Sequence, residues 1–533
     1  MAILSEDVLL KIFLHCLDFS PQFWPTLTHV CQSWRQIVFT SPRSLRLRLF
    51  YKDGRPVSKT PDGWPTLPVV VQYGGSPRLR SEAKDNVVAA LKQSGRVCSI
   101  NLVITSSLLE SLSTISDPFL ELEELVLLSQ ENTQLTPWLT LPSTFQWGPR
   151  LRTLHSTGVA FPSFPQLLLP SRDLVDLQLH KIPVLEYFFP EEFANALSGM
   201  TQLRSLSLDF LYRSPRNDFG LPSTSGQHIF LPSLTFLKYR GTSKYLDSLV
   251  TRIYAPYLEN VDITFFGQNT VDTSQLSQFI ERIETLKSHS QADVLITELA
   301  ISFRFLRPGT PTSLGLQILC EQLDRQLFLM GQICNHLSPL LFRVKDLHLN
   351  STRTSSRQDE IDGQRWLELI GAFGSAEDFR VTGELATDML CALSPVDSEH
   401  TTILPSLHNL FVPELSLEYG PLWDAAQSFM NSRWLRSSYA VQAVLSSTIF
   451  PALCGGEGMS GQPRQYFCTL CNISFTERQS LERHHGDWHM LRILCSHCSD
   501  FEWPLGYDDL FREHLESKHP ELTLTDAVIP NLA

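Results

Sequence analysis

The sequence predicts an α/β protein built of three parts: an N-terminal helical unit, an irregular repeat solenoid and a small C-terminal metal-stabilised module. The first fifty residues carry apolar side chains at helical spacing, and the middle of the chain repeats a leucine phrase at intervals of 23 to 31 residues up to residue 258, with gaps of 38 and 48 residues after that. Four of the eleven cysteines form two Cys-x-x-Cys pairs near the C-terminus. We therefore divide the chain into a helical unit (1–50), a transition segment (51–96), the solenoid (97–450), a linker (451–465) and the metal module (466–520).

Length, charge and cysteine usage restrict the class of protein. The 533 residues suffice for two to four domains, and a hydrophobic content of 43% provides a large core. The net charge of −13 disfavours general nucleic-acid or membrane-surface binding, because both need a basic face. The N-terminus shows no basic region and no long apolar run, so we expect neither a signal peptide nor a membrane span. A cytosolic or nuclear protein follows, whose cysteines are free thiols or metal ligands.

Two helical patterns occupy the first forty residues. Ser5 precedes Glu6 and Asp7, which places a hydroxyl cap and an acidic first turn at a helix start. The second pattern ends at Ser41-Pro42, because the residue before a proline avoids the helical conformation. The apolar positions of the shared seam are Leu4, Val8, Leu9, Ile12, Phe13, Leu27, Val30 and Trp34. Such a small unit buries little surface by itself, so we expect it to dock on a partner.

These residues resemble the F-box. The matching pieces are Leu4 to Leu9 (LSEDVL) with Ile12-Phe13, then Leu27 to Arg35 (LTHVCQSWR), and finally Ile37 to Pro42 (IVFTSP). Ser5 stands where the family usually has a proline. The resemblance implies a helical unit whose apolar seam binds the Skp adaptor of a cullin-based ubiquitin ligase. The alternative interpretation is an ordinary helical cap on the repeat domain.

The segment 51–96 is interpreted as a transition to the repeats. Turn phrases such as Asp53-Gly54 and Gly74-Gly75 surround the apolar run Leu67–Tyr73, which predicts a short buried strand. Residues 82–93 predict a helix.

A repeated phrase, L-x-x-L-x-L, dominates the region after residue 97. Its last two apolar residues point to the same face of a strand, and the first turns inward from the preceding loop. One repeat cannot cover its own apolar face, so repeats of this kind stack into a leucine-rich-repeat solenoid. The copies are Leu122-Leu125-Leu127, Leu174-Leu177-Leu179, Leu203-Leu206-Leu208, Leu234-Leu237-Tyr239, Leu258-Val261-Ile263, Ile296-Leu299-Ile301, Val344-Leu347-Leu349 and Leu407-Leu410-Val412, with a degenerate copy at Leu151-Leu154.

Helices and loops are expected between these strands. The stretches Ser274–Ser288 and Leu314–Leu337 show helical periodicity and should cover one side of the solenoid. Proline phrases such as Leu231-Pro232 extend the chain into the next strand. The polar residues 351–364 predict an exposed loop. This region resembles the leucine-rich repeats that follow fungal-type F-boxes, and the alternative is a mixed α/β domain with leucine-rich strands.

The C-terminal cysteines and histidines form two candidate zinc sites. In the first, twelve residues separate Cys471 from His484, and Phe475 and Leu481 occupy the two core positions of a ββα finger. Two thiolates from a hairpin and two imidazoles from one helix face give a closed tetrahedral Zn²⁺ site, whose metal would supply the folding energy of the module. The predicted ligands are Cys468, Cys471, His484 and His489, with His485 as an alternative to His484.

The second candidate site has a less regular spacing. Fifteen residues separate Cys498 from His514, three more than is usual, and the insertion 501–505 falls in the expected hairpin. The predicted ligands are Cys495, Cys498, His514 and His519, with His497 as an alternative. This finger also resembles the CCHH family.

The charge of the two fingers disfavours a role in reading DNA. Residues 466–519 hold nine Asp or Glu against five Lys or Arg, whereas neutralisation of phosphate dominates nucleic-acid affinity. The segment Met490–Leu494 is apolar and unlike the usual linker between DNA-reading fingers. Protein binding or a structural cap is the favoured role of the module.

No enzyme motif stands out, because the chain contains no P-loop, no nucleophile elbow and no H-E-x-x-H. Both candidate zinc sites offer four protein ligands, whereas a catalytic zinc keeps an open position. We interpret the chain as a non-enzymatic adaptor. It would bind the Skp adaptor and cullin through its N-terminal helices and an unidentified protein substrate through its repeats. The alternatives are a zinc-finger nucleic-acid-binding regulator, or an interaction scaffold in which the F-box assembles no ligase.

Overall fold

A computed structural model divides the chain into two compact units, Met1–Ser446 and Ser447–Ala533. In the first unit the structure describes residues 5–19, 23–42, 44–51, 67–74, 81–129, 139–182, 188–210, 228–266, 268–287, 289–307, 309, 313–353, 363–383, 385–394, 403–412, 421–434 and 442–444. In the second it describes the strands β21 (Tyr466–Phe467), β22 (Ser474–Phe475), β23 (Arg492–Leu494) and β24 (Glu502–Pro504).

The described part of the first unit is mixed α/β, as predicted, and is built on a 16-stranded sheet. In spatial order the strands are β1 (Leu49–Tyr51), β2 (Val69–Tyr73), β3 (Val97–Ile104), β4 (Glu124–Ser129), β6 (Thr153–Thr157), β8 (Asp176–Ile182), β9 (Ser205–Phe210), β11 (Phe236–Gly241), β13 (Asn260–Phe266), β16 (Ser313–Leu319), β15 (Ala300–Leu306), β14 (Gln291–Ile296), β17 (Asp346–Ser351), β18 (Asp378–Gly383), β19 (Asn409–Phe411) and β20 (Gln442–Val444). The sheet thus already begins in the stretch before residue 97.

Leucines of successive repeats lie side by side in this sheet. In the parallel register Leu125 is opposite Leu154, which is opposite Leu177, which is opposite Leu206, and Leu237 follows. All five are at most 3% exposed, because alternate residues of a strand share one face and this face is covered. The register confirms the predicted repeat phrase over these strands, and the arrangement is compatible with a repeat solenoid.

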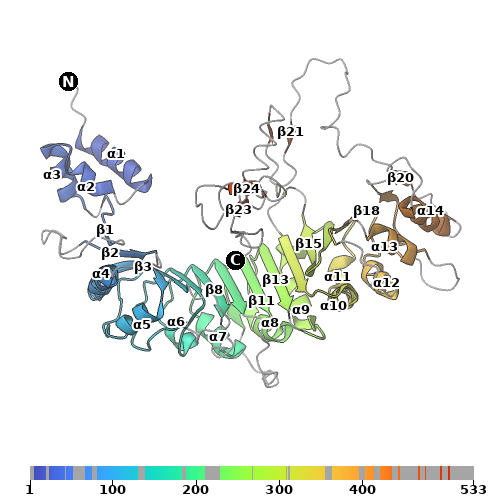
Figure 1. Ribbon diagram of the computed structural model, residues 1–533, viewed down its shortest axis with the longest axis horizontal. Coiled ribbons are helices and arrows are strands. Elements are labelled where there is room, and N and C mark those ends of the chain that lie inside the picture. The colour runs from blue at the N-terminus through green and yellow to red at the C-terminus, as the bar shows by residue number, and fades with distance from the viewer. Residues whose placement is uncertain are drawn as a thin grey trace, which may run out of the picture. The chain divides into compact units, whose positions relative to one another are not determined.

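Helices cover the leucine-bearing side of the sheet (Figure 1). The helices that alternate with the strands of this sheet are α4 (Ser81–Leu91), α5 (Ser106–Leu112), α6 (Phe164–Leu168), α7 (Pro190–Leu197), α8 (Ser243–Val250), α9 (Ser274–Glu281), α10 (Leu323–His336), α11 (Ser338–Leu341), α12 (Gly363–Gly371), α13 (Ala386–Ala392) and α14 (Pro421–Trp434), with 3₁₀ turns η3 (Ser94–Arg96) and η5 (Glu284–Lys287). Helix α4 and strand β2 confirm the helix and strand predicted in 51–96, and α9 with η5 confirms the helical stretch from Ser274.

Short secondary ladders accompany several repeats. Strand β5 (Leu139–Thr140) pairs with β7 (Val159–Ala160), and β10 (Ile229–Phe230) pairs with β12 (Ile253–Tyr254), both parallel. Each of these strands is followed, after one residue, by a proline. Because a proline has no N–H to donate to a ladder, the short strands end there and the chain turns toward the main sheet.

One part of the sheet contradicts the predicted repeats. The phrase Ile296-Leu299-Ile301 spans the turn between β14 and β15, and Leu299 is 62% exposed. Strand β15 is antiparallel to both of its neighbours, so β14, β15 and β16 form a meander inserted between β13 and β17. The predicted helix Leu314–Leu337 is also wrong at its start, because Ser313–Leu319 is strand β16 and helix α10 begins at Leu323. An alternating run and a helical run follow each other here, and their apolar residues merge into one pattern.

The ends of β17 and β18 approach each other closely. Gly383 is opposite Ser351 in the parallel register and has a φ of +91°. A Cβ atom at Gly383 would lie 1.9 Å from the carbonyl oxygen of Ser351. Only glycine satisfies both conditions, since it tolerates positive φ and has no Cβ.

Candidate functional site

The N-terminal helices form a small unit with its own core. They are α1 (Glu6–Phe19), α2 (Trp24–Leu27) and α3 (Gln32–Thr40). The buried apolar side chains of this core are Leu9, Phe13, Leu17, Trp24, Ile37, Val38, Leu45, Leu47 and Leu67. Leu49 packs against both this core and the core of the sheet. The helical unit is therefore attached to the first strands of the solenoid while closing a core of its own.

Trp34 and Arg35, the most specific residues of the F-box resemblance, hold this unit together. The Trp34 ring meets the Phe13 ring edge-on, with 4.7 Å between centroids. Arg35 Nε donates to the backbone oxygen of Thr28 at 2.8 Å, which links α3 to the end of α2. The Cys31 side chain caps α3 by accepting from the Trp34 backbone N–H at 3.5 Å. Trp34 thus contributes to the internal packing as well as to the surface.

The predicted apolar seam is divided between the core and the surface. Leu9 and Phe13 are buried, and Leu27 and Trp34 are partly buried against the core. Val8, Ile12 and Val30 are instead 42%, 40% and 56% exposed. Leu4 lies outside the described residues. Helical spacing predicts one apolar seam, but it does not tell which of its residues face the core of the unit and which remain at the surface.

Two further exposed apolar residues, which the sequence reading missed, belong to the same unit. Phe23 and Phe39 are 57% and 44% exposed. Five of the fifteen exposed large apolar side chains in the described part of the chain therefore fall between residues 8 and 39. These five side chains remain exposed although the unit closes a core of its own.

The face of the sheet away from the helices is polar and carries cross-strand pairs of charged or titratable groups. His155 Nε2 lies 2.7 Å from Asp176 Oδ2, and His348 Nδ1 lies 3.8 Å from Asp293 Oδ1. Lys238 Nζ lies 3.9 Å from Asp262 Oδ2, also on neighbouring strands. Pairs of opposite charge on adjacent strands stabilise a sheet modestly. This face therefore presents polar groups that already have partners.

Burial and hydrogen bonds shift the pKa values of three groups on this face. It lowers the pKa of His348, and it lowers that of His180 together with the nearby Lys238 charge, so both imidazoles stay neutral near pH 7. Burial alone would raise the pKa of Asp176, but hydrogen bonds from His155, Ser205 and Gln178 outweigh it and the pKa falls. The face is therefore a set of paired groups, of which His155 and Asp176 are hydrogen-bonded, rather than a row of uncompensated charges.

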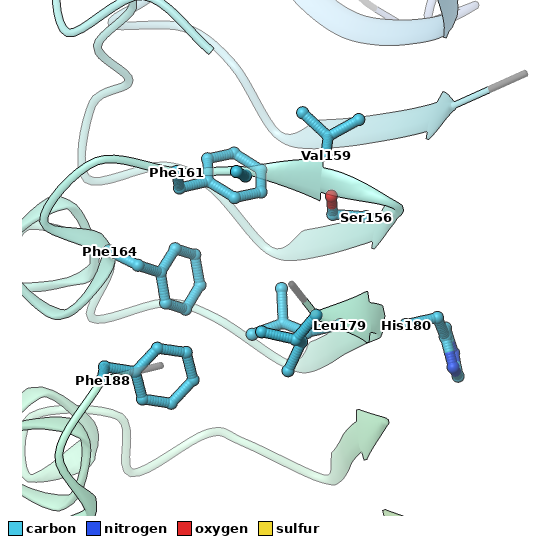
Figure 2. Close-up of a pocket in the computed structure, with 9 residues that line it drawn as sticks. Ser156, Val159, Phe161, Phe164, Leu179, His180 and Phe188 are labelled. Carbon is cyan, nitrogen blue, oxygen red and sulfur yellow. The ribbon is translucent and has the colours of Figure 1, made fainter. Parts of the chain in front are cut away.

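A small cavity lies where one repeat departs from the phrase. Ser156 occupies the position that Leu127 and Leu179 hold on the neighbouring strands. The resulting space of about 20 Å³ is enclosed by aromatic rings on the helix side, among them Phe161, Phe164 and Phe188, while His180 points away from it (Figure 2). A space of this size has room for about one water molecule, so it is a packing defect rather than a ligand site.

Removal of the Ser156 hydroxyl is expected to be harmless or stabilising. The Ser156 oxygen is buried and has no hydrogen-bond partner among the described residues, and such a group costs about 1 kcal/mol or more. Ser156→Ala should leave the free energy of unfolding unchanged or raise it by about 1 kcal/mol, as measured by urea denaturation. Leu179→Ala, at the same position of the next strand, should lose about 2–5 kcal/mol. A clear loss for Ser156→Ala would show that the hydroxyl is satisfied.

All eight predicted zinc ligands lie outside the described residues, as do the alternatives His485 and His497. The strands beside them are described. Strand β21 pairs with β22 antiparallel, and β23 pairs with β24 antiparallel. One Cys-x-x-Cys falls between the strands of each pair. The insertion 501–505 contains β24, and the apolar segment Met490–Leu494 contains β23.

Two absences hold for the described residues. No three His, Cys, Asp or Glu side chains there are grouped so that they could hold a metal ion. No helix of that part is long and apolar enough to span a bilayer.

The comparisons with known proteins give little. No family model matches the chain, and no curated protein matches it. Among solved structures, the chain is similar to the leucine-rich repeat-containing protein LegL7 from Legionella pneumophila, with 11% sequence identity and a TM-score of 0.24. That similarity covers 65% of this chain and 93% of LegL7.

Proposed function

We propose that the chain is a non-enzymatic substrate-recognition adaptor of a Skp–cullin–F-box ubiquitin ligase. The observation that carries the proposal is the N-terminal unit, which closes a core of its own and still exposes Val8, Ile12, Phe23, Val30 and Phe39. Helix α1 shows both roles, since Leu9 and Phe13 face inward while Val8 and Ile12, one turn apart, remain outside. Apolar side chains of this kind are the anchors that protein partners bury.

The repeat sheet would present the substrate. Its polar face combines two histidine–aspartate pairs with the Lys238–Asp262 pair, which suits a partner with a polar surface. Stacked repeats offer an extended face of this type, and neighbouring repeats can vary it independently. The unit that binds the ligase and the face that binds the substrate are thus different parts of one chain.

A charged substitution on α1 tests the proposal. Ile12→Asp should weaken binding of the Skp adaptor by about tenfold or more, because it places a carboxylate in an apolar interface. Ile12 is 40% exposed, so the core of the unit is spared. Leu169→Asp places the same carboxylate on another exposed aliphatic residue, outside the N-terminal helices, and should bind normally. The measurement is co-purification of the tagged full chain with the adaptor and cullin, and Trp34→Ala is a poorer test because Trp34 contacts Phe13.

The outcomes separate the competing functions. Recovery of both adaptor and cullin with the wild-type chain, lost with Ile12→Asp, supports a ligase. Recovery of the adaptor without cullin indicates a scaffold that assembles no ligase. Failure to bind any Skp adaptor contradicts the proposal.

We further propose that the C-terminal unit binds two Zn²⁺ ions through the predicted cysteine and histidine ligands. The two antiparallel hairpins support this, because a CCHH finger takes its thiolates from a hairpin that brackets a Cys-x-x-Cys. Bound zinc would supply folding energy to a short segment with few apolar residues. The acidic composition of residues 466–519 favours a structural or protein-binding role over nucleic-acid recognition.

A further inference from the structure

A half-open cavity of about 140 Å³ lies where the strand order of the large sheet is interrupted. Strand β13 pairs with β16 rather than with β14, the next strand in the sequence. The segments that follow β13 and β16 therefore come from different parts of the repeat array. The cavity is at the carboxyl ends of both strands, beside Phe265, Phe266 and Ile318.

The walls of the cavity are held in place before any ligand arrives. Helix α10 contributes Leu329 and Arg325, and Arg325 Nη2 donates to the backbone oxygen of Gln268 at 2.7 Å. The backbone N–H of Val271 donates to Gln332 Oε1 of the same helix at 2.9 Å. The segment that closes the cavity is thus tied to α10 at two points. Little ordering is needed on binding, which favours affinity.

The side chain of Gln268, one of the lining residues, is fixed by two hydrogen bonds. Gln268 Oε1 accepts from the backbone N–H of Ser243 at 3.0 Å and from its hydroxyl at 2.7 Å. Because a backbone N–H can only donate, this contact fixes which end of the amide is oxygen. The remaining atom, Gln268 Nε2, is buried and makes no hydrogen bond among the described residues. Because this nitrogen has almost no accessible surface, it lies behind the cavity wall, and Gln268 contributes to the site as a fixed part of that wall.

Size and chemistry together define the occupant. A cavity of about 150 Å³ accepts a benzene-sized apolar molecule, whereas pockets for free ligands usually measure about 300–1,000 Å³. A single apolar side chain fits this space, and the rest of a partner protein supplies the affinity that so small a ligand lacks. We infer that the cavity takes one leucine-sized side chain of a protein substrate.

This inference rests on the proposed function only in calling the partner a ligase substrate. The nine lining residues include one with a formal charge, Arg325, at the half-buried rim with Gln268 and Cys320. A guanidinium there disfavours a basic residue next to the anchor and favours an acidic one. The recognised segment is therefore an apolar residue with neutral or acidic neighbours.

The test uses the full chain without any Skp adaptor, so ligase assembly does not affect it. The probe is N-acetyl-leucinamide, titrated by saturation-transfer NMR, with N-acetyl-serinamide as the matched control. Leucinamide should bind at least about tenfold more tightly, because burial of its side chain favours binding. It should also protect Cys320, which lines the cavity, from alkylation without protecting the exposed Cys391, as read by mass spectrometry.

Two variants locate the interaction. Val271→Phe should abolish binding by filling the cavity, and Cys320→Phe replaces it if a thermal melt shows that Val271→Phe is misfolded. Equal binding of leucinamide and serinamide, or binding unchanged by a folded filling variant, would overturn the inference. Protection of Cys320 by benzene but not by leucinamide would assign the cavity to small apolar compounds instead.

Discussion

Gly383→Ala is expected to destabilise the first unit by about 3 kcal/mol or more. Two costs add at this position. A residue with a Cβ pays about 1–2 kcal/mol for a left-handed backbone, and Gly383 has a φ of +91°. Its new Cβ would also lie 1.9 Å from the Ser351 oxygen, and relieving such an overlap inside a packed array costs a further 1–3 kcal/mol or so. The neighbouring strands pair along their whole length, so neither end is free to move.

Gly371→Ala is the matched control for this substitution. Gly371 is the last residue of α12, and a Cβ there meets nothing within 4 Å. Its effect should stay within about 1 kcal/mol of wild type, because alanine is the better helix former. Urea denaturation followed by circular dichroism measures both variants. Equal midpoints for Gly383→Ala and Gly371→Ala would mean that β17 and β18 do not approach each other as described.

Removal of zinc is expected to have the second large effect, confined to the C-terminal unit. The purified chain should carry two zinc ions, and structural zinc contributes on the order of 10–16 kcal/mol to the folding of small fingers. Chelation should therefore unfold Ser447–Ala533 and leave the melting transition of Met1–Ser446 in place, since the two units are separately compact. Binding should weaken in acid, because protons compete for thiolate and imidazole.

Cysteine variants separate the two proposed sites. Cys468→Ser should remove one zinc per chain, whereas Cys454→Ser, outside both Cys-x-x-Cys pairs, should remove none. Elemental analysis of the full chain counts the metal, and a thermal melt with and without chelator follows the folding. One zinc or less in the wild-type chain would refute the two-site proposal. Loss of every melting transition on chelation would refute the independence of the units.

The parallel part of the sheet was predictable because its signal is local. Each copy of the phrase places two apolar residues on one face of a strand, and a period near 23 to 31 residues leaves room for one strand and one connection. Strands β4, β8, β9, β11, β13, β17 and β19 all coincide with copies of the phrase. Strands β14, β16 and β18 carry the same alternation without the leucine at the approach, so the phrase misses them.

The direction of each strand and the strands that it pairs with were not predictable from the sequence. The alternation of apolar and polar residues is the same in a parallel and in an antiparallel strand. Nothing in the phrase Ile296-Leu299-Ile301 shows that the chain turns back after Ile296, where β14 ends, before β15 begins at Ala300. The same limit applies to the N-terminal seam, where Val8 and Leu9 are equally apolar but only Leu9 faces a neighbour. The candidate cavity beside Gln268 depends on residues of β13, β16 and α10, which meet only through the interrupted strand order. The pattern within a segment therefore predicts its secondary structure, whereas the place of a site depends on contacts between segments that are distant in the sequence.

The meander also affects how the protein is made. In a simple repeat array each new strand pairs with the one just synthesised, so the nascent chain can fold as it leaves the ribosome. Here β13 remains an unpaired edge until residues 313–319 have emerged, because β14 and β15 precede its partner β16. Growth of the array halts at β13 and resumes only after three strands have been added together. During that interval the edge of β13 is available to other chains, which makes this point of synthesis the one most exposed to misassociation.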